Sequence, residues 1–232
     1  MHHALADSPP RPPAPRASVR TALALAGCSV LLLTLVALEW GPLIALDEGI
    51  ARTTHRWAHQ DPGLTRTSRI LTDWVWDPDT MRLLVAAVLV WLVWRRSAWW
   101  TAGWLLVTVA LATGLQQFLK AAVGRARPVW PDPVDSAHYA AFPSGHAMTA
   151  TVVCGLLLWL LRRHGVTGVL WRTAFGVALV SVLGVGLTRV WLGVHWVTDV
   201  VGGWLFGATV VAVAVAVFER RAPAESEPAH RA

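Results

Sequence analysis

The chain has 232 residues, of which 55% are hydrophobic and only 15% are charged. So few charged side chains could not cover the water-facing surface of soluble domains of this total length, which excludes an ordinary soluble enzyme. Apolar runs close to the roughly 20 residues needed to cross a bilayer recur along the chain. The sequence therefore predicts an all-α fold, a polytopic membrane bundle of about six transmembrane helices.

The formal net charge is +6. The arginines flank apolar runs, so membrane orientation and contact with lipid headgroups explain this charge better than nucleic-acid binding does. Lys120 is the only lysine, which indicates either a GC-rich codon bias or an ammonium group kept for an anion. The two cysteines, Cys28 and Cys154, lie inside apolar runs, and no metal-ligand spacing is recognised. The expected partners are the bilayer and a lipid, with no metal and no cofactor, and the oligomeric state stays open.

The chain is expected to begin with a disordered, Pro- and Arg-rich tail over residues 1–18. A membrane domain over residues 19–220 follows, and a second disordered tail covers residues 221–232. The first apolar segment resembles a signal peptide, but the Glu39-Trp40-Gly41-Pro42 stretch after it is no small-residue cleavage site, so we expect a retained helix. The six apolar segments span about residues 21–38, 81–94, 99–119, 145–161, 170–188 and 198–218.

The basic residues predict the orientation of the chain. With an even number of spans both tails share one side, and that side collects eleven of the 20 lysines and arginines. Three of the other nine belong to the candidate site described below. This bias predicts a multi-pass protein of the plasma membrane with cytoplasmic termini. The long loop over residues 41–80 and the active site would then face the extracytoplasmic side.

The first polar stretch at the outward ends of the spans begins at Lys120 and ends at Arg127-Pro128. Seven residues are close to two helical turns, so both cations are expected on one helical face, with Pro128 ending the helix. Two converging cations suit an anion with several oxygens, such as phosphate. Taken alone, the pair is explained as well by a basic surface that meets anionic headgroups.

The second stretch is Phe142-Pro143-Ser144-Gly145-His146, directly before the fourth apolar segment. Pro143 and Ser144 are typical of a helix start, where unpaired backbone N–H groups bind anions. Ser144 adds a hydroxyl group, and Gly145 permits close approach of a ligand. His146 is expected beside the bound anion.

The third stretch contains Arg189 at the end of the fifth segment, Gly193 as a turn, and His195 and Asp199 at the start of the sixth. A spacing of four places the imidazole and the carboxylate on one helical face. The carboxylate would fix the tautomer and leave the other ring nitrogen available as a nucleophile. The alternative, a His–Asp pair on a helix surface, is weakened by the cost of an acid at the membrane.

Together the three stretches resemble the signature of the type 2 phosphatidic acid phosphatase (PAP2) superfamily. That signature reads Lys, six residues, Arg-Pro; then Pro-Ser-Gly-His; then Ser-Arg, five residues, His, three residues, Asp. The chain matches it in order and spacing from Lys120 to Asp199, and departs only where Thr188 stands in place of serine. The resemblance implies a helical core like that of the membrane members and of the soluble haloperoxidases.

The resemblance also implies roles for the site residues. His195 would attack phosphorus, Asp199 would orient it, and His146 would protonate the leaving oxygen and then activate water. The phosphate oxygens would be bound by Lys120, Arg127, Ser144, Gly145 and Arg189. The implied function is metal-independent hydrolysis of a lipid phosphate or diphosphate through a phosphohistidine.

Two alternatives remain open at this point. The same phosphohistidine could pass its phosphate to a lipid or sugar hydroxyl, which would make the protein a phosphotransferase. A small transporter or lipid-binding protein is the second alternative, although charges near mid-span would then be expected. The substrate is also open among undecaprenyl diphosphate, phosphatidylglycerol phosphate and phosphatidic acid.

Overall fold

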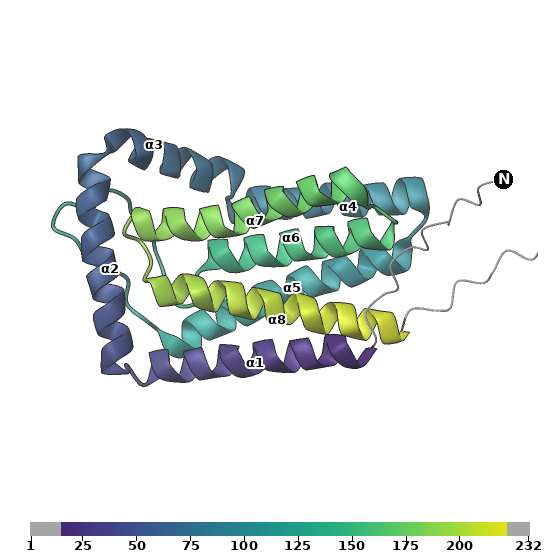
Figure 1. The fold of residues 1–232 in the computed structure, drawn as a ribbon, viewed down its shortest axis with the longest axis horizontal. Coiled ribbons are helices and arrows are strands. Elements are labelled where there is room, and N and C mark those ends of the chain that lie inside the picture. Colours follow the sequence, from purple (N-terminus) through teal and green to yellow (C-terminus); the bar gives the residue numbers. More distant parts are fainter. Residues whose placement is uncertain (1–14, 222–232) are drawn as a thin grey trace, which may run out of the picture.

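The computed structural model describes residues 15–221, with side chains from residue 19 onward. Within that range the chain forms helices and connecting loops and contains no strand, as the all-α prediction requires (Figure 1). The elements are α1 (Pro15–Ala37), α2 (Gly41–Gln60), α3 (Pro62–Ile70), the π-helical turn η1 (Leu71–Val75), α4 (Pro78–Arg96), α5 (Trp99–Val123), α6 (Gly145–Arg163), α7 (Gly168–Trp191) and α8 (Val197–Arg221). Almost all of both predicted tails lies outside the described residues.

Six long helices run side by side and correspond to the six predicted apolar segments (Figure 1). Helix α6 contacts α4, α5, α7 and α8, and α1 packs along α8. Five of the six, all but α4, are long and apolar enough to cross a membrane. Helix α4 differs because its 19 residues carry charges at Asp79, Arg82, Arg95 and Arg96.

The segment over residues 41–80 is helical, and the prediction of a long loop there is wrong. Helix α2 lies across one end of the bundle, and α3 runs back along its side (Figure 1). Prolines in the first turn start α2, α3 and α4. The Asp61 carboxylate caps α3 by accepting the Leu64 N–H at 2.8 Å, and Asp77 caps α4 in the same way. These caps separate the segment into helices.

Close packing of α6 against α8 sets the geometry of this end of the bundle. A Cβ atom added at Gly203 would lie 2.7 Å from the Ser144 carbonyl oxygen, and one at Gly207 would lie 3.0 Å from the Met148 carbonyl oxygen. Small residues four apart let two membrane helices approach with their backbones nearly in contact. The start of α6 is therefore held directly against the first turns of α8.

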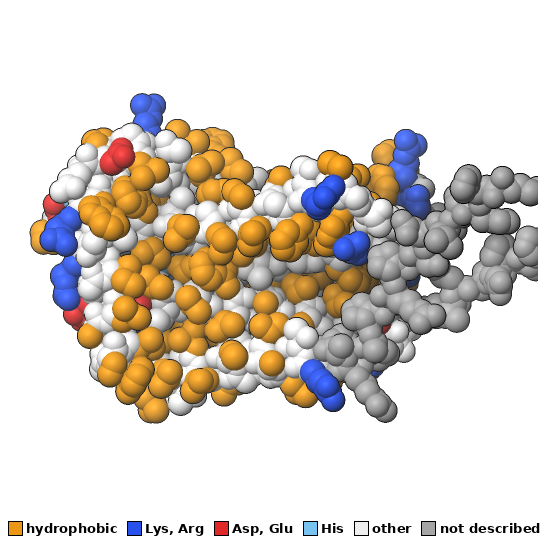
Figure 2. All heavy atoms as spheres, viewed as in Figure 1, with side chains coloured by type: hydrophobic (Ala, Val, Ile, Leu, Met, Phe, Trp, Pro, Cys, Tyr) orange, Lys and Arg blue, Asp and Glu red, His pale blue; other side chains and the backbone are white. Residues whose placement is uncertain are grey.

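Charge and apolar surface are separated along the long axis of the molecule. Figure 2 shows hydrophobic side chains over the middle of the visible face and basic side chains toward the two ends. The end away from α2 carries Arg20, Arg95, Arg96, Arg162, Arg163, Arg172, Arg220 and Arg221. Together with the five apolar helices, this distribution identifies a multi-pass membrane protein.

Candidate active site

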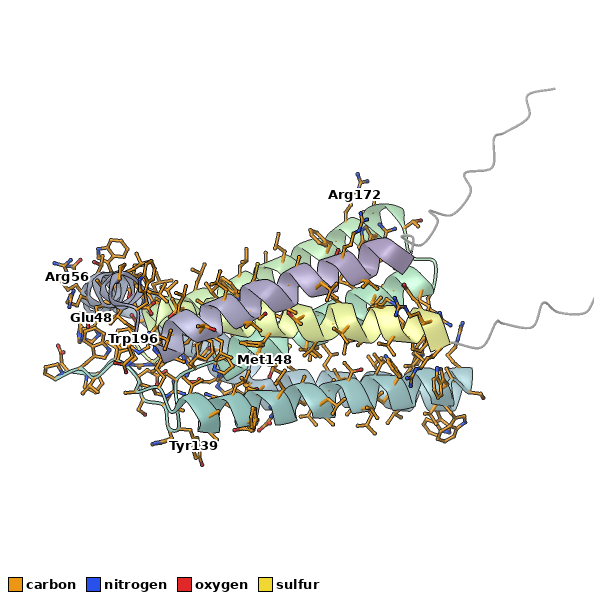
Figure 3. All side chains as sticks on the ribbon, turned by 90° about the horizontal axis from the view of Figure 1, so that it is seen from below. Glu48, Arg56, Tyr139, Met148, Arg172 and Trp196 are labelled. Carbon is orange, nitrogen blue, oxygen red and sulfur yellow. The ribbon has the colours of Figure 1, made fainter. Side chains whose placement is uncertain are left out.

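The three predicted stretches meet at the end of the bundle that α2 covers. They come from the last turn of α5 and the loop after it, the first turn of α6, the last turn of α7 and the first turn of α8 (Figure 1). Figure 3 shows Tyr139 and Trp196 at this end, Met148 deeper in the bundle and Arg172 toward the opposite end. The fold thus gathers residues that are some eighty positions apart in the chain.

The hydrogen bonds of His195 determine which ring nitrogen carries its proton. Arg127 Nη1 lies 3.1 Å from His195 Nε2, and His195 Nδ1 lies 3.2 Å from Asp199 Oδ2. A guanidinium group can only donate, so Nε2 must accept and the ring proton must sit on Nδ1, facing the carboxylate. The ring therefore presents the lone pair of Nε2 to the cationic side of the site.

Burial keeps this imidazole neutral. His195 is 1% exposed, and its pKa is lowered well below the ordinary value of 6.5, first by burial and then by the charges of Arg127, Arg189 and Lys120. A neutral ring with an unprotonated Nε2 is the form that can attack phosphorus.

The local backbone around His195 differs from the prediction in one respect. Helix α8 begins at Val197, so His195 lies in the turn before it and does not share a helical face with Asp199. Gly193 makes this turn with a φ of +68°, a conformation that glycine adopts readily. Asp199 Oδ2 also accepts the Trp196 N–H at 2.9 Å. The contact between His195 and Asp199 therefore depends on the turn before α8, which the Asp199 carboxylate caps by accepting the Trp196 N–H.

Arg127 is also placed differently from the prediction. Helix α5 ends at Val123 because Gly124 adopts a left-handed conformation, with a φ of +60°. Arg127 thus lies beyond the helix, and Pro128 is not what ends it. Its guanidinium group donates to the Val194 and Tyr139 carbonyl oxygens at 2.6 and 2.9 Å. Lys120 stays in the last turn of α5 and donates to the Ala140 carbonyl oxygen.

Three buried polar atoms at this end have no hydrogen-bond partner among the described residues: Ser144 Oγ, Arg189 Nε and, on α2, His55 Nδ1. Ser144 is the N-cap of α6, as predicted, and its N–H donates to the Asp199 carbonyl oxygen at 2.9 Å. Gly145 and His146 begin the helix. Donors left unpaired beside a helix N-terminus suit an oxyanion.

His146 lies in the first turn of α6, directly after Ser144 and Gly145. The structure therefore brings all eight predicted site residues to one end of the bundle. The hydroxyl of Thr188, which stands where the signature has serine, bonds to the Val185 carbonyl and to Thr72 on the α3 side.

Two further residues of the site were missed in the sequence analysis: Arg125 and Asp47. Arg125 Nη1 donates to Asp199 Oδ1 at 2.7 Å, and Nη2 donates to Asp47 Oδ2 at 2.7 Å. Asp47 is 1% exposed and also accepts the Thr198 N–H at 3.0 Å. Arg125 lies within the first signature stretch, and this could have drawn attention to it. Asp47 had no such signal, because it lies in the segment expected to be a loop.

A possible metal-ligand set was also missed. His55 and His59 are four apart on α2, a helical ligand spacing, and Asp132 of the loop after α5 lies beside them. Around His195, by contrast, the Asp199 carboxylate is already engaged by Arg125, Trp196 and the imidazole.

Comparison with known proteins agrees with the sequence pattern and the fold. The chain is 32% identical over 130 residues to a protein named lipid A 1-phosphatase from Rhizobium johnstonii, an alignment that covers 52% of this chain and 49% of that protein. It is 36% identical over 94 residues to phosphatidylglycerophosphatase B of Bacillus subtilis, covering 40% and 46%. The chain thus spans about half the length of the curated relatives it matches.

The fold agrees with a crystal structure of a transmembrane PAP2-type phosphatidylglycerolphosphate phosphatase from Bacillus subtilis. The TM-score is 0.76 at 23% identity, and the match covers 87% of this chain and 97% of that one. The family model described as the PAP2 superfamily matches residues 101–223, more than half of the chain, a range that contains all eight predicted site residues. The chain therefore belongs to the PAP2 superfamily.

Proposed function

We propose that this protein is a membrane-embedded phosphatase that removes phosphate from a lipid phosphate or diphosphate by way of a phosphohistidine at His195. The observation that carries the proposal is the position of the His195 ring between Asp199 and Arg127. Because the guanidinium group can only donate, this position assigns the ring proton to Nδ1, beside Asp199, and leaves the Nε2 lone pair toward Arg127. This is the arrangement that a nitrogen nucleophile needs.

The proposed reaction has two displacements. In the first, His195 Nε2 bonds to phosphorus, the phosphorus–oxygen bond to the lipid breaks, and His146 gives its proton to the leaving oxygen. The negative charge of the bound phosphate stabilises that proton on His146 beforehand. In the second, a water molecule attacks phosphorus, His146 takes a proton from it, and the phosphorus–nitrogen bond breaks. Inorganic phosphate leaves, and both imidazoles return to their starting states.

Positive charge on the protein stabilises the transferred group in both displacements. Lys120, Arg127 and Arg189 supply cations, and Ser144 Oγ and Arg189 Nε are donors without a partner among the described residues. Donors fixed in place before the reaction stabilise the developing charge without reorganising. This arrangement supports a chemical step that uses no metal ion.

The experiment compares His195→Ala and His146→Ala with the wild-type protein. Each variant is purified in detergent and assayed for phosphate released from phosphatidylglycerol phosphate, phosphatidic acid and undecaprenyl diphosphate. Both should lose at least about 10³-fold in kcat while keeping the wild-type melting temperature. Brief incubation with a ³²P-labelled substrate should trap acid-labile label on the wild-type protein and none on His195→Ala. Full phosphate release by either variant would refute its assigned role.

The substrate class and the side of the membrane are part of the proposal. The relatives named above support a lipid that carries a terminal phosphate, and the substrate panel ranks the three candidates. The arginines at the end away from α2 support cytoplasmic termini and an outward-facing site in the plasma membrane. Adding a lipid or sugar alcohol to the assay separates hydrolysis from transfer, because only a transferase would phosphorylate the added alcohol.

A further inference from the structure

Helix α2 and the loop after α5 bring two imidazoles and a carboxylate together outside the membrane-spanning helices. His55 and His59 lie one turn apart on α2, and Asp132 comes from the loop between α5 and α6. From this geometry we propose that His55, His59 and Asp132 form a binding site for Zn²⁺ or a similar transition-metal ion, separate from the phosphate site.

The distances between the two imidazole nitrogens, and from each of them to one oxygen of the Asp132 carboxylate, are close to the separation of neighbouring ligands in a tetrahedral zinc site. His55 Nε2 and His59 Nε2 are 3.3 Å apart, His55 Nε2 is 3.2 Å from Asp132 Oδ1, and His59 Nε2 is 3.3 Å from Asp132 Oδ2. Zinc bonds to nitrogen and oxygen of about 2.0–2.1 Å place neighbouring tetrahedral ligands about 3.3 Å apart. One ligand atom from each of the three residues lies within 4.8 Å of the other two, which is close enough for the three groups to share one ion.

Without an ion, the two imidazoles compete for hydrogen bonds within this cluster. If both Nε2 atoms carry protons toward Asp132, the two N–H groups lie beside each other at 3.3 Å and repel. If one Nε2 is unprotonated, it can accept from the other ring but loses its bond to the carboxylate, and the Asp132 carbonyl oxygen, 3.1 Å from His59 Nε2, is the remaining acceptor. A metal ion accepts a lone pair from both rings at once and pairs with the negative charge of Asp132, which removes the conflict.

The surroundings hold the ligands in place. The ring of His55 stacks on Trp130 with centroids 4.0 Å apart and planes 8° apart, and the Trp130 indole N–H donates to the Gly193 carbonyl oxygen at 2.9 Å. His55 is 7% exposed, whereas Asp132 is at the surface, so an ion can enter from solvent. Two imidazoles and one carboxylate favour zinc over magnesium or calcium, which prefer oxygen ligands alone.

The position of the cluster gives the ion a structural role. Asp132 belongs to the same loop as His138 and Tyr139, whose carbonyl oxygens hold Arg127. An ion bound at Asp132 and to both α2 histidines would fix this loop against the helix that covers the site. Loss of the ion should therefore loosen the binding of phosphate, while the reacting imidazole and its carboxylate stay in place.

Metal content tests the inference directly. The protein is purified through a histidine-free tag with His2 and His3 replaced by alanine, loaded with Zn²⁺, dialysed, and analysed by mass spectrometry of the metal. We expect about one zinc ion per chain. His59→Ala and Asp132→Asn should each lower the zinc affinity at least about tenfold, because each removes one of three ligands. His138→Ala, an exposed histidine of the same loop, is the matched control and should keep the metal.

Two further measurements separate this inference from the proposed phosphatase reaction. Co²⁺ in place of Zn²⁺ should give the visible absorption of a tetrahedral complex in the wild-type protein and in His195→Ala, and none in His59→Ala. Hydrogen exchange over residues 129–137 should become faster when the metal is removed. Wild-type protein that retains no zinc after dialysis, or His59→Ala that retains it fully, would overturn the metal site whatever the outcome of the phosphate assays.

Discussion

Replacing Asp199 with asparagine should nearly abolish turnover while leaving substrate binding intact. Both carboxylate oxygens of Asp199 accept hydrogen bonds from groups that only donate: Oδ1 from Arg125, and Oδ2 from the Trp196 N–H. An asparagine must point its NH₂ group at one of these donors. When the NH₂ takes the place of Oδ2 it also faces His195 Nδ1, and the ring proton is driven onto Nε2. That tautomer has no lone pair for phosphorus.

The magnitude follows from the charge that the carboxylate supplies. At 3.2 Å, a carboxylate and the positive charge that forms on His195 after attack interact by about 5 kcal/mol at an effective dielectric constant of about 20. A loss of about 3–5 kcal/mol from the transition state corresponds to a decrease in kcat of about 10²- to 10⁴-fold. KM should change little, because Lys120, Arg127 and Arg189 are untouched.

The assay measures kcat and KM for phosphate release, and ¹⁵N NMR of the imidazole reports which ring nitrogen of His195 is protonated. Asp47→Asn is the matched control, because it makes the same change at a buried carboxylate that contacts Arg125 without touching His195. Its kcat should fall by less than about tenfold, and its imidazole should keep the proton on Nδ1. An Asp199→Asn protein with near wild-type kcat, or with the Nδ1 proton in place, would refute the reasoning.

Three other predictions follow from the geometry. Burial lowers the pKa of His195 well below 6.5, so as pH falls through 6.5 the unfolded chain takes up a proton at this residue and the folded chain does not. The free energy of unfolding should therefore decrease below pH 6.5 by up to about 1.4 kcal/mol per pH unit. His195→Gln should flatten this slope, measured in thermal melts at several pH values. Gly203→Ala should lower the free energy of unfolding by about 1–3 kcal/mol, because the added Cβ would meet the Ser144 carbonyl oxygen, and the melting temperature should fall. The control Gly176→Ala, whose added Cβ has nothing within 4 Å, should not destabilise the protein. Arg125→Lys should lower kcat about tenfold or more with an unchanged KM, because an ammonium group cannot span both buried carboxylates, and restored activity on adding guanidinium to the assay would support this reading.

The residues of the candidate site were predictable from sequence because the membrane leaves few reasons for polar side chains at span ends. Lys120, Arg189 and Asp199 stand out against apolar surroundings, and the spacing between such residues matches a known signature. The number and order of the long helices were readable for the same reason, since about 20 apolar residues form a recognisable unit.

Local geometry was less predictable than the choice of residues. Arg127 and His195 were both assigned to helices, yet each lies in a turn beside a glycine with positive φ. A spacing of four or seven residues brings two side chains together in a helix, but a helix end followed by a turn can do the same. The spacing alone therefore does not show which of these backbone conformations is present. Gly124 and Gly193 carried the relevant signal, because glycine is the residue that a left-handed turn favours.

The segment over residues 41–80 was misjudged because its helices are amphipathic and short of apolar runs. In α2 the buried residues Asp47, Ala51, His55 and Ala58 recur at helical spacing, and two of the four are polar. A search for apolar stripes does not find such a face. Only the fold shows that it packs against the site, where Asp47 reaches Arg125 and Thr198.

Arg127 links substrate binding to the exposure of the nucleophile in the proposed reaction. Its Nη1 lies 3.1 Å from His195 Nε2, the atom that must attack, and also donates to the Val194 carbonyl oxygen. The Tyr139 and His138 carbonyl oxygens hold Nε and Nη2. A phosphate oxygen is a stronger acceptor than a neutral imidazole, so arriving phosphate should take the N–H that faces His195 and leave Nε2 facing phosphorus. The same guanidinium group that protects the resting nucleophile would then bind the group to be transferred. Arg127 should therefore affect both KM and kcat, whereas Asp199 should affect kcat alone.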